Sequence, residues 1–255
     1  ASGFTTYDMN KLPHLGAGKS KDVVDQLGLE ALMKAANGGP IKRPSDGKEV
    51  KSVVFIQCAG QRSDKEGELP YCSGHCCNTS IKQAMYFKDQ NPDIDTVVMY
   101  TDLRTPGNGE DFYRSAQKKG VIFTKGVASE VVTGGELQVK FNDKILNEDA
   151  IAKADLVVLA TGMVANSGVD IDAVKQDEPG QWAENKVSVL NMTYRQGKDL
   201  PLLKHGFNDS HFICFPYETR RTGIYTAGPV RRPMDMAQAI EDATGATLKA
   251  IQAVE

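Results

Sequence analysis

Short apolar runs alternate with amphipathic segments through the middle of the chain. The runs at 52–57, 96–101 and 121–125 have the length of buried strands, and the segments 76–88 and 110–119 between them repeat with the period of a helix. This strand–helix order is typical of a parallel sheet with right-handed crossovers. We therefore predict an α/β fold built around a nucleotide-domain-like parallel sheet.

The same pattern predicts further elements on either side of this alternation. The segment "ELQVKF", within 129–146, alternates polar and apolar residues, which indicates an antiparallel meander. Ser20 is placed to cap a helix that runs from 21 to about Ala36. The other expected elements are a buried strand over 154–162, a short buried strand over 223–228 and a long helix over 234–254. Between 163 and 215 the pattern predicts no element.

Composition narrows the possible function classes. Of the 255 residues, 40% are hydrophobic and 25% are charged, and the formal net charge is −3. Because no basic excess is available to neutralise phosphates, we expect no nucleic-acid partner. No apolar stretch approaches the roughly 20 residues of a membrane span, so we expect no direct membrane insertion. No secretory signal is visible, and since the first residue is not Met we expect a fragment of a longer protein.

Four of the five cysteines lie within twenty residues of one another. They are Cys58, Cys72, Cys76 and Cys77. An odd count and such crowding suit a metal or redox site in a reducing compartment better than a secreted disulfide framework, so we expect a cytoplasmic protein. Cys214 stands alone in "HFICF", and we expect it in the core.

Four interpretations of these cysteines compete. Adjacent cysteines beside a turn cannot both pack in a core, which disfavours purely structural thiols. A zinc site usually takes two C-x₂₋₄-C pairs, and only Cys72 and Cys76 form one. A dithiol redox centre would need a C-x-x-C pair at a helix start, which is missing. Four thiolates also suit an iron–sulfur cluster, although the spacing follows neither common ferredoxin pattern.

Two features of the segment favour the cluster among these alternatives. Three glycines make the loop pliable enough to wrap an inorganic core, and Cys76 and Cys77 stand at the start of the expected helix. Unpaired N–H groups and the positive end of the helix dipole stabilise thiolates there. The fingerprint G-x-G-x-x-G does not follow the strand 52–57, so we expect no nicotinamide cofactor at this turn.

Other polar residues lie near the cysteines or the strand ends in the sequence. With four thiols available, His75 is expected to be a neighbour that tunes the site, not a ligand. Asp102 ends the second strand, where a ribose would need a carboxylate, and without the glycine loop we interpret it as vestigial or as a turn cap. Arg62 and Arg104 are expected to be solvated surface residues.

Several stretches taken together match the pattern of one known family. They are "FIQCAGQR", "PYCSGHCC", "IKQA", "RPSDGK", "FYRSAQKKGVIFTKG", "ADLVVLATGM" and "GIYTAGPVRRPMDMAQAIEDATGATLKAIQAV". Over most of its length the chain resembles the heterodisulfide reductase A-subunit family. Its members are thioredoxin-reductase-like iron–sulfur flavoproteins with an extra cluster in what would be the nicotinamide domain. The terminal "RRPMDMAQAIEDATGA" is similar to flavoprotein subunits of the quinone-interacting membrane-bound oxidoreductase complex of sulfate reducers.

The resemblance implies cofactors, site residues and domains. It implies a [4Fe–4S] cluster ligated by Cys58, Cys72, Cys76 and Cys77, and FAD in the full-length protein, facing Thr161, Gly162, Gly228, Pro233, Met234 and Asp235. Since no Rossmann strand and glycine loop precede residue 1, we expect this fragment to purify without flavin. The implied domains are a linker and part of the flavin domain at 1–50, a cluster-bearing domain like a nicotinamide domain at 51–161, and the C-terminal part of the flavin domain at 162–255.

The resemblance also predicts an activity. It predicts an oxidoreductase component that passes electrons between FAD and a [4Fe–4S] cluster to partner subunits of an electron-transfer complex, peripheral to a membrane. We identify no catalytic acid, base or nucleophile, and we expect the fragment to be inactive alone. Two alternatives are a pyridine-nucleotide disulfide oxidoreductase that uses its cysteine thiols and a zinc-stabilised interaction module.

Overall fold

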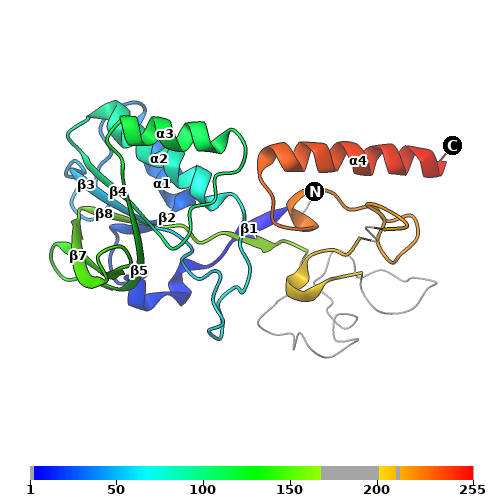
Figure 1. The fold of residues 1–255 in the computed structure, drawn as a ribbon, viewed down its shortest axis with the longest axis horizontal. Coiled ribbons are helices and arrows are strands. Elements are labelled where there is room, and N and C mark those ends of the chain that lie inside the picture. The colour runs from blue at the N-terminus through cyan, green and yellow to red at the C-terminus, as the bar shows by residue number, and fades with distance from the viewer. Residues whose placement is uncertain (1–2, 168–200, 211–212, 255) are drawn as a thin grey trace. The chain divides into compact units, whose positions relative to one another are not determined.

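The computed structural model describes residues 3–167, 201–210 and 213–254 (Figure 1). The chain divides into two compact units. One is Tyr7–Gly162, and the other combines Ala1–Thr6 with Met163–Glu255. All four clustered cysteines belong to the unit Tyr7–Gly162.

A seven-stranded sheet forms the centre of the unit Tyr7–Gly162. Its order is β2-β8-β3-β4-β5-β6-β7, with parallel pairing from β2 to β5 and antiparallel pairing from β5 to β7. The strands are β2 (Val23–Asp25), β3 (Ser52–Ile56), β4 (Asp95–Tyr100), β5 (Ile122–Val132), β6 (Leu137–Asp143), β7 (Glu148–Ala154) and β8 (Leu156–Leu159). The predicted α/β fold, a parallel sheet with an antiparallel meander, is confirmed.

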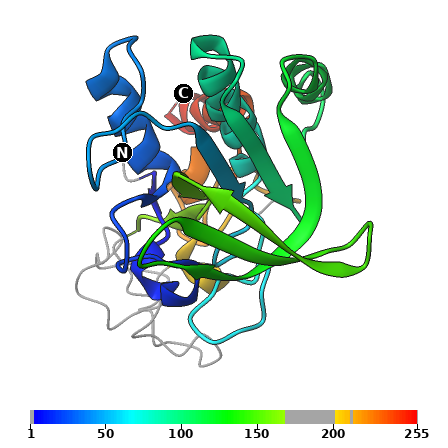
Figure 2. The same cartoon turned by 90° about the vertical axis from the view of Figure 1, so that its left-hand side faces the viewer.

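Three helices cover one face of this sheet. They are α1 (Gln26–Ala36), α2 (Cys76–Gln90) and α3 (Gly109–Lys118), and they lie side by side (Figure 2). Beneath them the rings of Phe55 on β3 and Phe87 on α2 meet edge to face with their centroids 6.3 Å apart. Such pairs stabilise a core by about 0.5–1.5 kcal/mol beyond the burial of their area. Two short 3₁₀ turns, η1 (Met9–Lys11) and η2 (Pro13–Leu15), precede β2.

The start of α1 differs from the prediction. Val23–Asp25, expected inside a helix, forms β2 and pairs in parallel with β8. The cap of the helix is Asp25 and not Ser20, because the Asp25 carboxylate accepts the N–H of Gly28 at 2.6 Å. β-branched valines favour an extended backbone, and their partner strand lies far along the chain, so the local helical period could not reveal this strand.

The strand after α3 is longer than predicted. β5 continues from its parallel pairing with β4 into its antiparallel pairing with β6, with a register shift between Ala128 and Glu130. An irregularity of this kind bends a strand and increases its twist, which lets one strand serve both parts of the sheet. The hydrophobic pattern predicts the two parts of β5 as separate segments.

Residues 7–50 lie in the same compact unit as the cysteine loop. The resemblance assigns them to a linker and part of a flavin domain. In the structure they contribute β2 at one edge of the sheet and α1, which packs against α2. A strand of three residues leaves too short a hydrophobic pattern to be recognised in the sequence.

The second unit contains few regular elements among its described residues. They are an antiparallel pair of β1 (Phe4–Thr6) and β9 (Met163–Ala165), the turns η4 (Lys204–Gly206) and η5 (Gly228–Val230), and α4 (Met236–Val254). The strand predicted over 223–228 is wrong, because Tyr225 forms an isolated bridge with Glu218 and Gly228 begins η5. Most of the segment for which no element was predicted, 168–200 and 211–212, lies outside the described residues.

Helix α4 begins two residues later than predicted because of its cap. The Asp235 carboxylate accepts the N–H of Gln238 at 2.8 Å, and the Gln238 side chain accepts the N–H of Asp235 at 3.3 Å. This reciprocal pair is a capping box, which holds Asp235 just outside the helix. None of the helices in the described part of the chain is long and apolar enough to cross a membrane.

Candidate metal centre

The cysteine loop leaves the carboxyl end of β3 and ends at the start of α2. Cys58 follows β3 closely, whereas Cys76 and Cys77 are the first two residues of α2. Both of these helical cysteines are buried, while Cys58 and Cys72 are half-buried. The fold therefore brings three of the four cysteines to the edge of the sheet where open α/β proteins bind ligands, and the loop between β3 and α2 supplies Cys72.

The backbone of the loop turns sharply after Cys58. Cys58, Gly60 and Arg62 have φ values of 56°, 70° and 53°, all in the left-handed region. For a residue other than glycine this conformation costs of the order of 1–3 kcal/mol. The loop folds back on itself, since Leu69 donates its N–H to the Gly60 carbonyl at 2.9 Å. Two strained non-glycine positions within five residues are typical of a functional turn.

Tyr7 holds this turn from outside the loop. Its hydroxyl donates to the Gly67 carbonyl at 2.7 Å, and its ring lies so close to Gly60 that a Cβ there would be 2.6 Å from a ring carbon. Gly60 is thus required both by its φ and by this close packing. The sequence predicts pliability from the loop glycines, but the structure shows one of them clamped against an aromatic ring.

Each of the four sulfur atoms has an N–H donor directed at it. The donors are the Arg62 guanidinium for Cys58 at 4.0 Å, the Gly74 backbone for Cys72 at 3.4 Å, the Gln61 amide for Cys76 at 3.6 Å and the Arg104 backbone for Cys77 at 3.5 Å. Hydrogen bonds to sulfur favour the thiolate form and tune a metal bound by it. Such donors suit thiolate ligands of an anionic centre.

Hydrogen bonds to sulfur lower the pKa of a thiol, whereas burial raises the pKa of the metal-free thiols. It raises the pKa of Cys76 to about 12, and negative charge on the three other cysteines adds to this rise. Burial also raises the pKa of Cys58 and of Cys77. Without a metal, these three thiols stay protonated at neutral pH, so they do not have the lowered pKa of an attacking redox cysteine. A bound metal reverses this, since coordination deprotonates a thiol.

The first turn of α2 adds further polarity to the site. His75 is the N-cap residue, and its side chain makes no capping hydrogen bond, so the positive end of the helix dipole faces the cysteines without a side-chain cap. The His75 Nδ1 atom lies 3.9 Å from the Cys76 sulfur. His75 is therefore a close neighbour of one expected ligand.

Three buried amide atoms near the site lack hydrogen-bond partners among the described residues. Both polar atoms of the Gln57 side chain and the Oδ1 atom of Asn78 are buried without a hydrogen bond. Gln57 directly precedes Cys58, and Asn78 directly follows Cys77. Because buried polar atoms are rarely left unpaired, these amides fit a site that is completed by a polar group. In the described residues no three His, Cys, Asp or Glu side chains stand in a metal-binding arrangement.

Arg62 and the lone cysteine differ from their interpretations, whereas Arg104 is exposed as expected. Arg62 is not simply solvated, since it bridges the Cys58 sulfur and Asp102, whose carboxylate lies 2.6 Å from its guanidinium. Arg62 lowers the pKa of Asp102, which is an ion-pair partner here. Arg104 reaches the site through its backbone N–H. The prediction that Cys214 lies in the core is wrong, because this residue is exposed.

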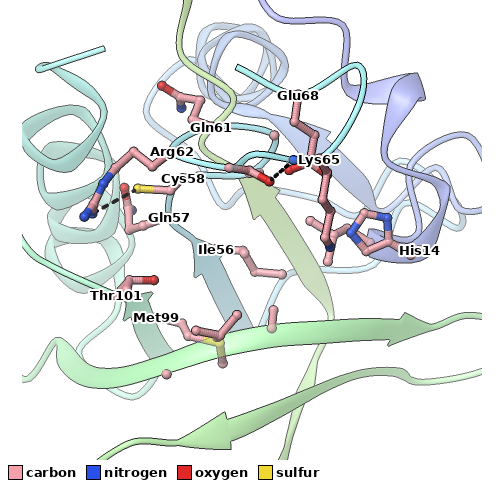
Figure 3. A pocket seen from close by; sticks show the side chains of 17 residues that line it. His14, Ile56, Gln57, Cys58, Gln61, Arg62, Lys65, Glu68, Met99 and Thr101 are labelled. Atoms are coloured by element: carbon pink, nitrogen blue, oxygen red, sulfur yellow. Dashed lines mark hydrogen bonds between the residues drawn. The ribbon is translucent and has the colours of Figure 1, made fainter. Parts of the chain in front are cut away.

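A pocket of about 320 Å³ adjoins the loop on the side of the antiparallel meander (Figure 3). Its lining includes Ile56, Met99, Thr101, Lys65, His14 and Cys58. In Figure 3 the Arg62 guanidinium reaches the Cys58 sulfur, while Lys65 and His14 lie together on the other side of the pocket. Cys58 is thus shared between the wall of this pocket and the cysteine site.

The six residues expected to face a flavin are divided between the two units. In the unit Tyr7–Gly162, Thr161 is buried and Gly162 packs against Gln61 and Ser73. In the other unit, the Gly228 N–H donates to the Asp242 carboxylate at 2.8 Å. There Met234 is buried, Pro233 is half-buried, and Asp235 caps α4. Asp235 thereby satisfies one N–H of the helix start that was expected to face the flavin, and the flavin contacts of all six residues stay a prediction.

Several residues of the site escaped the sequence analysis. They are Gln57, Gln61, Ser73, Tyr7 and Asn78. Glutamine and serine in a polar loop carry no periodic signal, and Tyr7 lies far from the cysteines in the chain. A buried "FIQ" at the end of an apolar run was the one available sign, since a glutamine directly after a buried strand needs a polar partner.

The fold is similar to that of a solved thioredoxin reductase. The crystal structure of T. acidophilum thioredoxin reductase superposes with a TM-score of 0.54, covering 99% of this chain and 64% of that chain at 15% identity. At this identity the likeness shows the fold alone. The thioredoxin-reductase-like architecture expected from the resemblance is confirmed. No protein-family model matches the chain.

Curated relatives agree with the resemblance seen in the sequence. The A subunit of H(2):CoB-CoM heterodisulfide,ferredoxin reductase from Methanothermobacter marburgensis is 32% identical over 257 residues, which cover 98% of this chain and 36% of the relative. The first iron–sulfur A subunit of CoB–CoM heterodisulfide reductase from Methanopyrus kandleri is 33% identical over 260 residues, with 98% and 36% covered. The chain thus spans little more than a third of these relatives, and over nearly its whole length it is a homologue of a segment of the heterodisulfide reductase A subunit.

Proposed function

We propose that the chain is the cluster-bearing part of an electron-transfer subunit in a heterodisulfide-reductase-like oxidoreductase. Cys58, Cys72, Cys76 and Cys77 would ligate one [4Fe–4S] cluster. The observation that carries this proposal is the set of four N–H donors, one directed at each sulfur atom. Four thiolates with hydrogen-bonded sulfurs are the usual protein environment of such a cluster.

A [4Fe–4S] cluster bound there would supply one-electron transfer between a flavin and a partner subunit. The residues of this chain supply the surroundings. Burial of Cys76 and Cys77 limits water at two of the ligands, and the first turn of α2 favours negative charge there. Arg62 places a positive charge beside Cys58, and Asp102 holds that guanidinium in place. These residues stabilise a centre with negative charge without taking part in bond-making chemistry.

The names of the relatives support a proposal about the wider assembly. Their names describe them as A subunits of heterodisulfide reductases, and one is called an iron–sulfur subunit. We propose that this chain likewise works with other subunits and with an FAD held by the full-length protein, and that it does so in the cytoplasm. A position of this chain at the periphery of a membrane complex is part of the same proposal, which is based on the resemblance of the terminal helix.

Metal analysis of the protein reconstituted with iron and sulfide under anaerobic conditions tests the proposal. We expect about four irons per chain and a brown colour. Replacing Cys76 by Ser should lower the iron content, whereas Cys214→Ser is the matched control, because Cys214 is exposed and belongs to the other unit. A colourless protein with one zinc would instead favour the zinc-stabilised module, and full iron in a variant lacking all four clustered cysteines would refute the proposal.

A further inference from the structure

Gln61 occupies a buried position among three segments of the cysteine site. Only 5% of the residue is exposed. Its amide nitrogen donates to the Ala160 carbonyl at 2.9 Å, at the end of β8, and lies 3.6 Å from the Cys76 sulfur. Its amide oxygen accepts the hydroxyl of Ser73 at 2.6 Å. One side chain thus connects the loop, the end of a strand and the start of α2.

The contacts determine which way the amide is oriented. The Ala160 carbonyl can only accept, so the group facing it must be the NH₂ of Gln61. With one amide hydrogen directed at that carbonyl, the second is available for the Cys76 sulfur. The Ser73 hydroxyl completes the arrangement by donating to the amide oxygen. In Figure 3 the Gln61 side chain points away from Ile56, which lines the adjoining pocket.

The backbone beside the amide is shaped to leave room for it. Gly162 has a φ of 80°, and a Cβ at this position would lie 2.1 Å from the Gln61 amide oxygen and 2.4 Å from the Ser73 hydroxyl. No side chain could occupy that space while both groups stay in place. Gly162, which the resemblance assigned to a flavin, therefore also forms part of the wall around Gln61.

We propose that Gln61 is a positioning residue that holds the Cys76 sulfur and raises the reduction potential of a cluster ligated there. This inference rests on the proposed function. An N–H directed at a ligand sulfur stabilises the more negatively charged, reduced state more than the oxidised state. The effect is strengthened by burial, because a hydrogen bond is electrostatically stronger away from water. Ser73 supports it by keeping the amide turned toward the sulfur.

Removal of the amide tests the proposal. Gln61→Met keeps a side chain of similar length and removes both N–H groups. The matched control is Gln83→Met, which removes a fully buried glutamine of helix α2 whose amide donates to the Gln26 carbonyl and to the Glu30 carboxylate. The reconstituted chain is poised anaerobically at a series of ambient potentials, and the reduced fraction of the cluster is measured by electron paramagnetic resonance.

At the midpoint potential of the wild-type cluster, we expect the ratio of reduced to oxidised cluster to be about tenfold lower in Gln61→Met. For one electron, this corresponds to a midpoint potential lower by about 59 mV. Ser73→Ala, which leaves the amide but removes its orienting hydroxyl, should shift the ratio in the same direction by a smaller factor. Gln83→Met should leave the ratio unchanged. A shift in Gln83→Met as large as that in Gln61→Met would overturn the inference, because general loosening would then explain both.

The failure of the inference and that of the proposed function can be told apart. If the wild-type chain assembles no cluster, the proposed function fails. If the wild-type cluster assembles and neither Gln61→Met nor Ser73→Ala changes the ratio, only the role of Gln61 is refuted. If Gln61→Met does not fold, Ser73→Ala decides, since a fall in the ratio supports the inference and an unchanged ratio refutes it.

Discussion

The replacement Gly162→Ala should destabilise the unit Tyr7–Gly162 well beyond the cost of its backbone conformation. At a φ of 80°, an alanine pays about 1–2 kcal/mol for the left-handed backbone. Its Cβ would also lie 2.1 Å from the Gln61 amide oxygen and 2.4 Å from the Ser73 hydroxyl, so one or both must move. Breaking that buried hydrogen bond costs about 1–3 kcal/mol more. We therefore expect a total loss of about 2–5 kcal/mol.

Urea unfolding followed by circular dichroism measures this loss. Gly47→Ala is the matched control, since Gly47 lies in the same unit with a φ of 71° and nothing within 4 Å of an added Cβ. It carries the backbone cost alone, about 1–2 kcal/mol. Equal losses in the two variants would refute the reasoning, because they would show that the Gln61–Ser73 pair does not constrain position 162.

Three further predictions concern the core, the thiols and the ion pair. Phe87→Ala should lower the free energy of unfolding by about 3–5 kcal/mol, because the buried ring leaves a cavity beside β3; a loss below about 1 kcal/mol in thermal unfolding would contradict this. In metal-free protein, mass spectrometry after brief alkylation should find exposed Cys214 modified first and Cys76, whose burial raises its pKa to about 12, among the last; equal rates would contradict it. Because Arg62 lowers the pKa of Asp102, the ion pair contributes stability above the unfolded pKa of about 3.9 that is lost as pH falls through the folded pKa. Acid unfolding should therefore depend less on pH in Arg62→Met than in wild type, and identical pH profiles would count against the pair.

The elements with a strong internal pattern were predictable from the sequence. β3 and β4 are apolar runs, and α2 carries Ile81 and Ala84 on a buried face, so their positions follow from period and length. β2 was not predictable, because its three residues continue the period of the neighbouring helix. The strand predicted over 223–228 does not form. Among the described residues, no strand lies beside this apolar run to pair with it.

The cluster of candidate cysteines was visible in the sequence, but its surroundings were not. Four cysteines around a turn are visible in the sequence itself. The hydrogen bond from Gln61 to Cys76 depends on three segments that meet only in the folded sheet. The same holds for the contact of Tyr7 with Gly60, because the two residues are far apart in the chain.

The most direct test of the central claim is an anomalous difference map, recorded at the iron absorption edge from crystals of the reconstituted chain grown without oxygen. The account predicts one compact iron peak within bonding distance of the sulfur atoms of Cys58, Cys72, Cys76 and Cys77. An iron peak bound elsewhere on the chain would contradict the account, and so would a single peak at the zinc edge between these four sulfurs.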